Sequence, residues 1–363
     1  MIREIRIDNY KSIKQLKLNL GRVTVLIGEN GCGKTNILEG IALVAAAASD
    51  RLDNEFLNSR GIRVTEPQLM RSGFEANQGT QNIKISLSGD NKLEFSCSLQ
   101  NDNKPYSQWI NRESKKLHDT VSLLNFLDQK YQNLGGSSEE YKSILRRFLQ
   151  KQQMLDKLSD LQRFVVYSPQ KQELRTFEKE EQLQPLGIHG EGLFKLLTVL
   201  NSHSNQTKLE EIKQKLKLIS WFEDFTIPSN LSPNERKIAI KDKFLDANLA
   251  YFDQKSANEG FLFLLFYFTL FISKETPTFF AIDNIDASLH PKLCSQLIKE
   301  LVQLAVKNNK QVIVTAHNPA ILTGLDLDND EQRIVVVYRN NAGHTQTKRI
   351  LKPKTAEAKK KAS

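Results

Sequence analysis

Alternating apolar and polar residues predict β-strands in the first hundred residues of the chain. The segments 2–7, 14–20 and 23–27 are alternating or apolar runs, and residues 81–99 alternate on both sides of a Gly89-Asp90 turn. An apolar-rich segment at 34–48 predicts a helix. The pattern therefore predicts an antiparallel β arm, with one strand that leads directly into a helix.

Strands and helices alternate in the second half of the chain, which favours a parallel sheet covered on both faces. The predicted strands are 164–167, 278–282, 311–315 and 333–338, the last being the final strand. The predicted helices are 191–219, 260–272 and 292–307. Between the two halves, residues 117–162 have a helical pattern that is broken at 135–138, which predicts a helical hairpin.

Composition places the chain among ordinary globular proteins. It has 363 residues, of which 39% are hydrophobic and 26% charged, and this excludes disordered, collagen-like and polytopic membrane proteins. The apolar run at 260–272 is shorter than the ~20 residues that a membrane-spanning helix needs, so a buried core helix is expected. Cys32, Cys97 and Cys294 are scattered, which argues against a disulfide framework and predicts a cytoplasmic location.

Net charge is a weak argument for a nucleic-acid partner. The chain carries +9, but residues 352–363 hold five lysines and one glutamate, or +4, which leaves +5 for the rest. Such a run without hydrophobic periodicity is typical of a solvated, flexible tail.

A phosphate-binding motif follows the strand predicted at 23–27. The residues Gly28-Glu29-Asn30-Gly31-Cys32-Gly33-Lys34-Thr35 fit G-x-x-x-x-G-K-[ST] at every fixed position, and a helix comes next. Glycines allow backbone N–H groups to face phosphates, the Lys34 ammonium would reach the β- and γ-phosphates, and the Thr35 hydroxyl would bind Mg²⁺. The candidate nucleotide-binding residues here are Asn30, Gly31, Cys32, Gly33, Lys34, Thr35 and Asn36.

Polar residues follow two of the later strands, where an α/β sheet usually binds its ligands. Asp283 ends the strand at 278–282 and is a candidate second Mg²⁺ ligand beside Thr35, whereas His317 ends the strand at 311–315. Ser256-Ala257-Asn258-Glu259-Gly260 opens the apolar helix, as an anion-binding N-terminus or as a simple helix cap.

Together these motifs resemble the ABC-type ATPases of the RecF/SMC/OLD branch. The resemblance rests on Asn9-Tyr10-Lys11-Ser12-Ile13, the phosphate loop, the Ser256–Gly260 turn, the Asp286–Pro291 D-loop and the Thr315–Pro319 switch, and it extends to about residue 350. It implies an α/β P-loop NTPase fold with a mixed central sheet flanked by helices, an antiparallel β arm and an inserted helical lobe. The expected domains are a composite head (1–100 and 164–350), a helical lobe (101–163) and a basic flexible tail (351–363).

In that family two heads enclose two ATP molecules, which gives several residues an expected role. Ser256, Asn258, Glu259 and Gly260 would cap the γ-phosphate held by the other subunit. Asp286 would line the dimer seam, and His317 would contact the γ-phosphate. Gln170 is the candidate Q-loop residue, with Gln68 as the alternative.

One departure from the family pattern bears on catalysis. A glutamate usually follows the Mg²⁺-binding aspartate and polarises the attacking water, but this chain has Asn284. An amide orients water without accepting its proton, and losing a positioned base typically costs about 10²–10⁴-fold in rate. Tight ATP binding and slow hydrolysis are therefore expected, with His317 or Asp286 as substitutes for the base.

Three functions fit these motifs. The first is a homodimeric or larger ATPase, similar to antiphage-defence ATPases of the Septu, PARIS and OLD types, that controls a separately encoded, nuclease-like effector. The second is a RecF-like repair ATPase that binds DNA, so nucleic acid stays among the candidate partners. The third is a scaffold locked by ATP, in which Asn284 has abolished turnover.

Overall fold

The computed structural model describes residues 1–74, 78–90, 93–104, 106–112, 159–177, 185–202, 205–232, 234–249 and 251–352. The chain forms two compact units, which are described separately. Unit 1 consists of Met1–Asn19, Thr35–Val166 and Arg339–Gln346, and unit 2 of Leu20–Lys34, Tyr167–Tyr338 and Thr347–Ser363. Residues 113–158 of the expected helical lobe and 353–363 of the expected tail lie outside the described residues.

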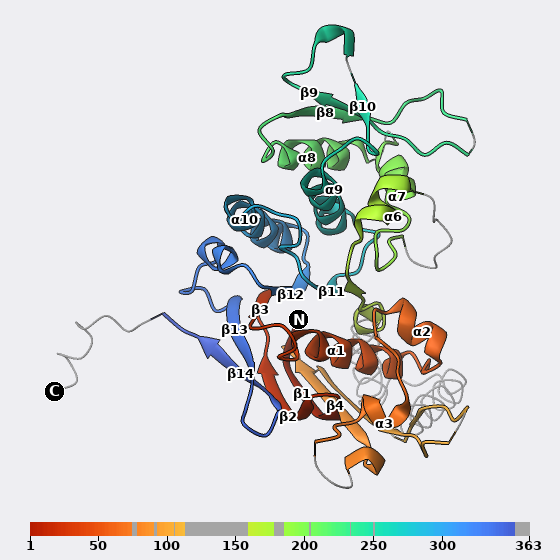
Figure 1. Cartoon of the computed structure of the whole chain (residues 1–363), viewed down its shortest axis with the longest axis vertical. Coiled ribbons are helices and arrows are strands. Elements are labelled where there is room, and N and C mark those ends of the chain that lie inside the picture. Colours follow the sequence, from red (N-terminus) through yellow and green to blue (C-terminus); the bar gives the residue numbers. More distant parts are fainter. Residues whose placement is uncertain are drawn as a thin grey trace, which may run out of the picture. The chain divides into compact units, whose positions relative to one another are not determined.

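Unit 1 contains an antiparallel sheet with the strand order β2-β1-β4-β5-β6 (Figure 1). Its strands are β1 (Ile2–Tyr10), β2 (Ile13–Asn19), β4 (Ile83–Gly89), β5 (Leu93–Gln100) and β6 (Ile110–Asn111). The helix α1 (Lys34–Ala48) packs closely on β1, because a Cβ atom on Gly40 would lie 2.7 Å from the Cδ1 atom of Ile7. Shorter elements are α2 (Asn54–Ser59), α3 (Pro67–Met70) and the 3-10 turn η1 (Gln78–Thr80). The predicted β arm is therefore confirmed.

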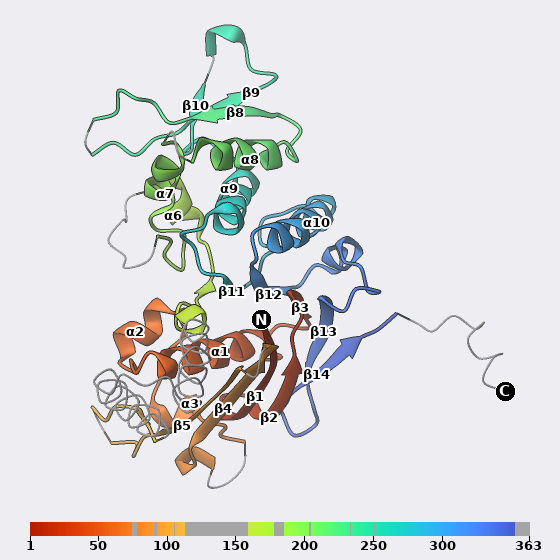
Figure 2. The same cartoon turned by 180° about the vertical axis from the view of Figure 1, so that it is seen from behind.

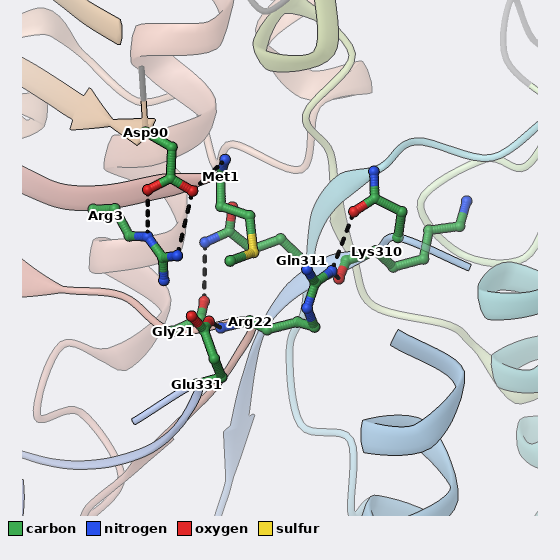
Figure 3. Close-up of polar contacts among 9 residues, drawn as sticks. Met1, Arg3, Gly21, Arg22, Asp90, Lys310, Gln311 and Glu331 are labelled. Carbon is green, nitrogen blue, oxygen red and sulfur yellow. Dashed lines mark hydrogen bonds and ion pairs between the residues drawn. The ribbon is translucent and has the colours of Figure 1, made fainter. Parts of the chain in front are cut away.

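The turn after β4 is held to the start of β1 by charge (Figure 3). Asp90 accepts hydrogen bonds from Arg3 Nε at 2.8 Å and from the amino group of Met1 at 3.2 Å. The Arg3 guanidinium accordingly keeps the pKa of Asp90 below its usual value.

Unit 2 contains the central strands of a second sheet, whose order is β14-β13-β3-β12-β11-β7. The strands are β3 (Val23–Ile27), β7 (Val166–Tyr167), β11 (Phe279–Ile282), β12 (Gln311–Ala316), β13 (Gln332–Arg339) and β14 (Thr345–Ile350). The four strands from β13 to β11 are parallel. Every residue of β11 and β12 is buried, as expected for strands covered on both faces.

Polar side chains fix the beginning of β3 against both of its neighbours, β12 and β13 (Figure 3). Gln311 Nε2 donates to the carbonyl oxygen of Gly21 at 2.9 Å, and the N–H of Arg22 donates to the Glu331 carboxylate at 3.0 Å. Arg22 Nη1 also donates to the carbonyl oxygen of Lys310 at 3.1 Å. These bonds set the register of the strand that carries the phosphate loop.

A helical layer in unit 2 surrounds α9 (Glu259–Ile272), in which every residue from Phe261 onward is buried (Figures 1 and 2). Its neighbours are α6 (Lys171–Thr176), α7 (Leu193–Leu200), α8 (Gln206–Leu216) and α10 (Pro291–Lys307). The unit also has a three-stranded sheet, formed by β8 (Phe222–Thr226), β9 (Ala239–Asp242) and β10 (Phe252–Asp253). The rings of Phe222 in β8 and of the preceding Trp221 pack against the ring of Phe261 in α9. The 3-10 turns η3 (Ala247–Leu249) and η4 (Pro319–Gly324) complete the unit. Among the described residues, no helix is long and apolar enough to cross a membrane.

Several predicted boundaries change. The strand expected at 164–167 is confined to Val166–Tyr167, and the helices expected at 191–219 are α7 and α8, which begin at Leu193 and end at Leu216. The expectation that 333–338 is the last strand was wrong, because β14 follows it. The sheet β8–β10 had no prediction either, since its strands are two to five residues long.

Candidate functional site

The loop at residues 28–33 leaves β3 and turns sharply before α1 begins at Lys34. Gly33 has φ +106°, a conformation that residues with a side chain rarely adopt. Gly28 is required because a Cβ atom there would lie 2.1 Å from the carbonyl oxygen of Val337 in β13. The two fixed glycines of the motif thus meet specific demands of the backbone.

The Lys34 side chain folds back over this loop and is 5% exposed. Its ammonium donates to the carbonyl oxygens of Gly28 and Glu29 at 2.8 and 3.0 Å, and its third neighbour is Nδ1 of His317 at 3.5 Å. Among the described residues these partners are neutral, so no carboxylate cancels the positive charge. The site can therefore attract an anion.

Asp283 is positioned by its neighbour on the next strand. The fully buried Thr315 in β12 donates its hydroxyl hydrogen to Oδ1 of Asp283 and accepts the N–H of Asn284 at 2.8 Å. The N–H of Asp283 donates to the carbonyl oxygen of Tyr167 at 2.8 Å. The carboxylate is consequently held in one orientation at the carboxyl end of the parallel strands.

Asn284 has φ +53°, in the left-handed region. The chain reverses there, and the N–H of Ala287 donates to the carbonyl oxygen of Asn284 at 3.0 Å. Asparagine, aspartate and glycine tolerate this conformation, whereas glutamate with its longer side chain is disfavoured. The backbone therefore accounts for asparagine at a position where the family usually has glutamate.

His317 lies between Lys34 and Asn284. Its Nε2 atom is 3.1 Å from Oδ1 of Asn284, and its Nδ1 atom is 3.5 Å from Nζ of Lys34. Because an ammonium has no acceptor, Nδ1 must accept from Lys34, and Nε2 then carries the proton that is donated to Asn284. These two contacts hold the His317 ring between the ammonium of Lys34 and the amide of Asn284.

Asp286 fixes the backbone of the segment that carries His317. One carboxylate oxygen, Oδ2, accepts the N–H of His317 at 2.8 Å and the N–H of Asn318 at 2.5 Å. The loop after β11 and the loop after β12 are thereby joined through a charged acceptor. The structure thus brings together Lys34, Asp283, Asn284, Asp286 and His317 of the predicted site.

The beginning of α9 is capped by Asn258, whose Oδ1 atom accepts the N–H of Phe261 at 2.8 Å. Ser256 lies in the preceding turn, and its hydroxyl contacts Asp253 at 3.4 Å. A Cβ atom on Gly260 would lie 3.6 Å from Leu289 in the D-loop. The helix-cap interpretation of this motif is therefore confirmed for Asn258, while the Ser256 hydroxyl does not cap the helix.

Among the described residues of unit 2, Gln170 makes no hydrogen bond to the phosphate loop or to Asp283. Gln170 is exposed and precedes α6, and its N–H donates to the carbonyl oxygen of His189 at 2.9 Å. Gln68 is exposed in unit 1, and its Nε2 atom donates to Glu66 at 3.0 Å. The choice between them stays a prediction.

A buried charge cluster in unit 1 was not predicted. Glu39 of α1 is fully buried and binds Lys11 Nζ at 2.5 Å and Arg63 Nε at 2.6 Å. Burial lowers the pKa of Lys11, although Glu39 opposes this shift. A cavity of about 480 Å³ is lined by Lys11, Arg63, Asn36 and the ring of Phe74, among others.

Some of the residues that were not predicted belong to recognisable sequence motifs, and others do not. Thr315 was part of the recognised switch motif, and a hydroxyl one strand away from Asp283 is an evident candidate partner. Lys11 belonged to the recognised Asn-Tyr-Lys-Ser start. Glu39 and Arg63 carried no signal, because each is a charged residue in an otherwise unremarkable segment and only the fold makes them partners.

The fold and its neighbours define the class of the protein. The chain is similar to the Smc head bound to the C-winged helix domain of ScpA, with a TM-score of 0.59 at 15% identity over 100% of this chain and 99% of that one. It is also similar to the Smc head domain with an extended coiled coil bound to the C-terminal domain of ScpA from Pyrococcus furiosus, with a TM-score of 0.53 at 13% identity over 99% of both. These likenesses concern the fold, which is that of an ABC-type ATPase head.

Part of the chain is similar in sequence to RecF proteins. The chain is 44% identical over 153 residues to the DNA replication and repair protein RecF of Bacillus cereus (strain G9842), which covers 41% of this chain and 36% of that protein. The RecF protein of Bacillus thuringiensis (strain Al Hakam) is 44% identical over 55 residues, 15% of each chain. The chain thus spans about a third or less of the length of these relatives.

A family model identifies the chain more closely. The model described as "AAA domain, putative AbiEii toxin, Type IV TA system" matches residues 23–323, which include Lys34, Asp283 and His317. The chain belongs to this family.

The role of Asp286 can be tested without any nucleotide. We expect Asp286→Ala to accelerate amide hydrogen exchange at residues 317–318 by about tenfold or more, because hydrogen bonds to a charged acceptor contribute ~1.5–3 kcal/mol. Hydrogen–deuterium exchange read by mass spectrometry measures this, with peptides from α10 as the internal control. Unchanged exchange at 317–318 would contradict the role given to this carboxylate.

Proposed function

We propose that the protein binds ATP with Mg²⁺ and hydrolyses it slowly. The observation that supports this best is the chain of contacts from Lys34 through His317 to Asn284. At one end, the Lys34 ammonium has no carboxylate partner in the part of the chain that the structure describes and can bind phosphate. At the other end lies the amide of Asn284, which can orient a water molecule. His317 lies between them, as expected for a residue that contacts the γ-phosphate.

The proposed Mg²⁺ ligands are the Thr35 hydroxyl and the Asp283 carboxylate. Both supply the hard oxygen atoms that Mg²⁺ prefers. The bond from Thr315 supports this role for Asp283, since it holds the carboxylate in place at the carboxyl ends of the parallel strands. When bound, Mg²⁺ would neutralise charge on the β- and γ-phosphates.

We further propose that ATP joins two copies of the chain. The N-terminus of α9 offers backbone N–H groups to a γ-phosphate held by the partner, with Asn258 shaping the turn and Gly260 permitting close approach. Ser256 and Glu259 belong to the same motif. Asp286 would lie at the seam, and Gln170, at the start of α6, stays the candidate Q-loop residue.

The biological role that we propose is control of a separately encoded, nuclease-like effector in bacterial antiphage defence, in the cytoplasm. The family description supports a role of this kind, because it names toxins of toxin–antitoxin systems. A RecF-like role in DNA repair is the second candidate, favoured by the 44% identity to a RecF protein over 153 residues. A scaffold locked by ATP is the third, favoured by the amide at Asn284.

Dimerisation is tested by removing the cation of the phosphate loop. In ATP and Mg²⁺ we expect the mass of the wild-type protein to double, whereas Lys34→Ala stays monomeric because the triphosphate loses its cation. Size-exclusion chromatography with light scattering gives both masses. Lys241→Ala, on the sheet β8–β10, is the control and should behave as wild type. An ATP-independent mass for the wild type would refute the ATP-linked dimer.

Hydrolysis is tested at Asn284. Asn284→Asp keeps a residue that tolerates positive φ and supplies a carboxylate that can accept a proton, so we expect phosphate release to rise by about tenfold. His317→Ala should lower it by about tenfold or more. If Asn284→Asp does not raise the rate, the missing base does not limit turnover. Wild-type release no faster than that of Lys34→Ala would favour the scaffold.

The proposed repair function requires binding to duplex DNA. A DNA-binding head would hold duplex DNA with an affinity that falls steeply with salt, by about 10³-fold or more between 50 and 200 mM if several phosphates are contacted. The measurement is fluorescence anisotropy with and without residues 352–363. Under the defence proposal we expect no steep, tail-independent salt dependence, and its observation would favour repair.

A further inference from the structure

A carboxylate stands at the helix end that is proposed to receive a phosphate. Glu259 is the first residue of α9. A negative charge there stabilises the free helix through the helix dipole. The same charge would repel the γ-phosphate of a partner subunit, because both are anions at one helix N-terminus. The proposed dimer therefore requires Glu259 to be neutralised or turned away.

The structure provides the neutralising charge. Oε1 of Glu259 forms an ion pair with Nζ of Lys171, the first residue of α6, and Oε2 accepts the hydroxyl hydrogen of Ser288 at 2.8 Å. Lys171 and Ser288 accordingly lower the pKa of Glu259. The carboxylate is thus ionised and has a partner on each oxygen. Ser288 itself has φ +59°, so the D-loop adopts an uncommon conformation where it makes this bond.

A second cation ties α6 to the turn before α9. Arg175 donates from Nη1 to the carbonyl oxygen of Lys255 at 2.8 Å and from Nη2 to that of Ala257 at 2.9 Å. The short helix that follows Gln170 therefore holds the start of α9 at both the turn and the first helical residue. Three segments meet through Glu259: the one after Gln170, the start of α9 and the D-loop.

A purely stabilising role explains this arrangement poorly. The side chains of Lys171 and Glu259 are 53% and 33% exposed, and ion pairs this exposed contribute little to folding stability. The distinctive feature is their location at the beginning of α9. Lys241 and Glu223 form an ion pair of similar exposure, 41% and 42%, on the sheet β8–β10.

We propose that Lys171 is a positioning residue that neutralises Glu259 and so allows the N-terminus of α9 to accept the γ-phosphate of a partner subunit. This proposal rests on the proposed ATP-dependent dimer. Lys171 allows the Ser256–Gly260 turn to bind phosphate. The segment that begins at Gln170 is thereby coupled to dimerisation. In this pair, Lys171 compensates the negative charge of Glu259. Removing Lys171 and removing the Glu259 charge should therefore have different effects on dimerisation.

The test is a double-mutant cycle on the ATP-dependent dimer, with its Kd measured by analytical ultracentrifugation in ATP and Mg²⁺. Lys171→Ala leaves Glu259 uncompensated and should weaken the dimer by about tenfold. Glu259→Gln removes the repulsive charge and should tighten it by about threefold. The double variant should return to within about threefold of wild type. Binding of a fluorescent ATP analogue to the monomer should be equal in wild type and Lys171→Ala, since Lys171 makes no contact with the phosphate loop.

The controls separate the outcomes. Lys241→Ala and Glu223→Gln test whether losing any exposed ion pair changes the dimer, and neither should. If Lys171→Ala and Glu259→Gln weaken the dimer equally, or Glu259→Gln fails to rescue Lys171→Ala, the pair is a structural bridge and the proposal is overturned. If wild type fails to dimerise with ATP, the proposed function itself fails. If wild type and Lys171→Ala dimerise equally well, the positioning role alone fails.

Discussion

The geometry of the site depends on the two backbone N–H groups that Asp286 binds. β11 and β12 are parallel neighbours, so the loops that leave them start side by side. The pairing of the strands does not by itself fix the conformation of these loops relative to each other. Oδ2 of Asp286 accepts the N–H groups of His317 and Asn318, and this fixes the second loop to the first. The imidazole of His317 can then bridge Lys34 and Asn284. Without this acceptor, the residues that follow the two strands would share a sheet edge but no common geometry.

Asn284 illustrates how backbone conformation and chemistry constrain the same position. Asn284 lies at positive φ, a conformation that asparagine adopts more readily than glutamate. The absence of the usual glutamate is therefore linked to the shape of this loop, and restoring it would strain the turn. Both ring nitrogens of His317 are engaged, Nδ1 with Lys34 and Nε2 with Asn284. Slow chemistry is consistent with this arrangement.

The sequence predicted the parallel strands and the phosphate loop because their signals are local. A continuous apolar run identifies a strand such as β3 or β12, and the loop has fixed glycines and a lysine at fixed spacing. β14 was missed because it is polar and lies at the edge of its sheet, where no apolar alternation is needed. The pairing of Glu39 with Lys11 and Arg63 links residues that are 28 and 24 positions apart. Such contacts follow from tertiary structure, which residue types alone do not specify.

The positions of individual charged side chains matter more for phosphate binding in this protein than its net charge does. The +9 of the whole chain suggests an anionic partner, yet two local features weigh more. Lys34 is buried among neutral acceptors and keeps its full attraction for phosphate, whereas Glu259 places a negative charge at a helix end of the same kind. Interactions over a few ångströms are screened far less than those between a distant tail and a ligand. The state of the Glu259–Lys171 pair therefore bears more directly on phosphate binding than the sum of the surface charges does.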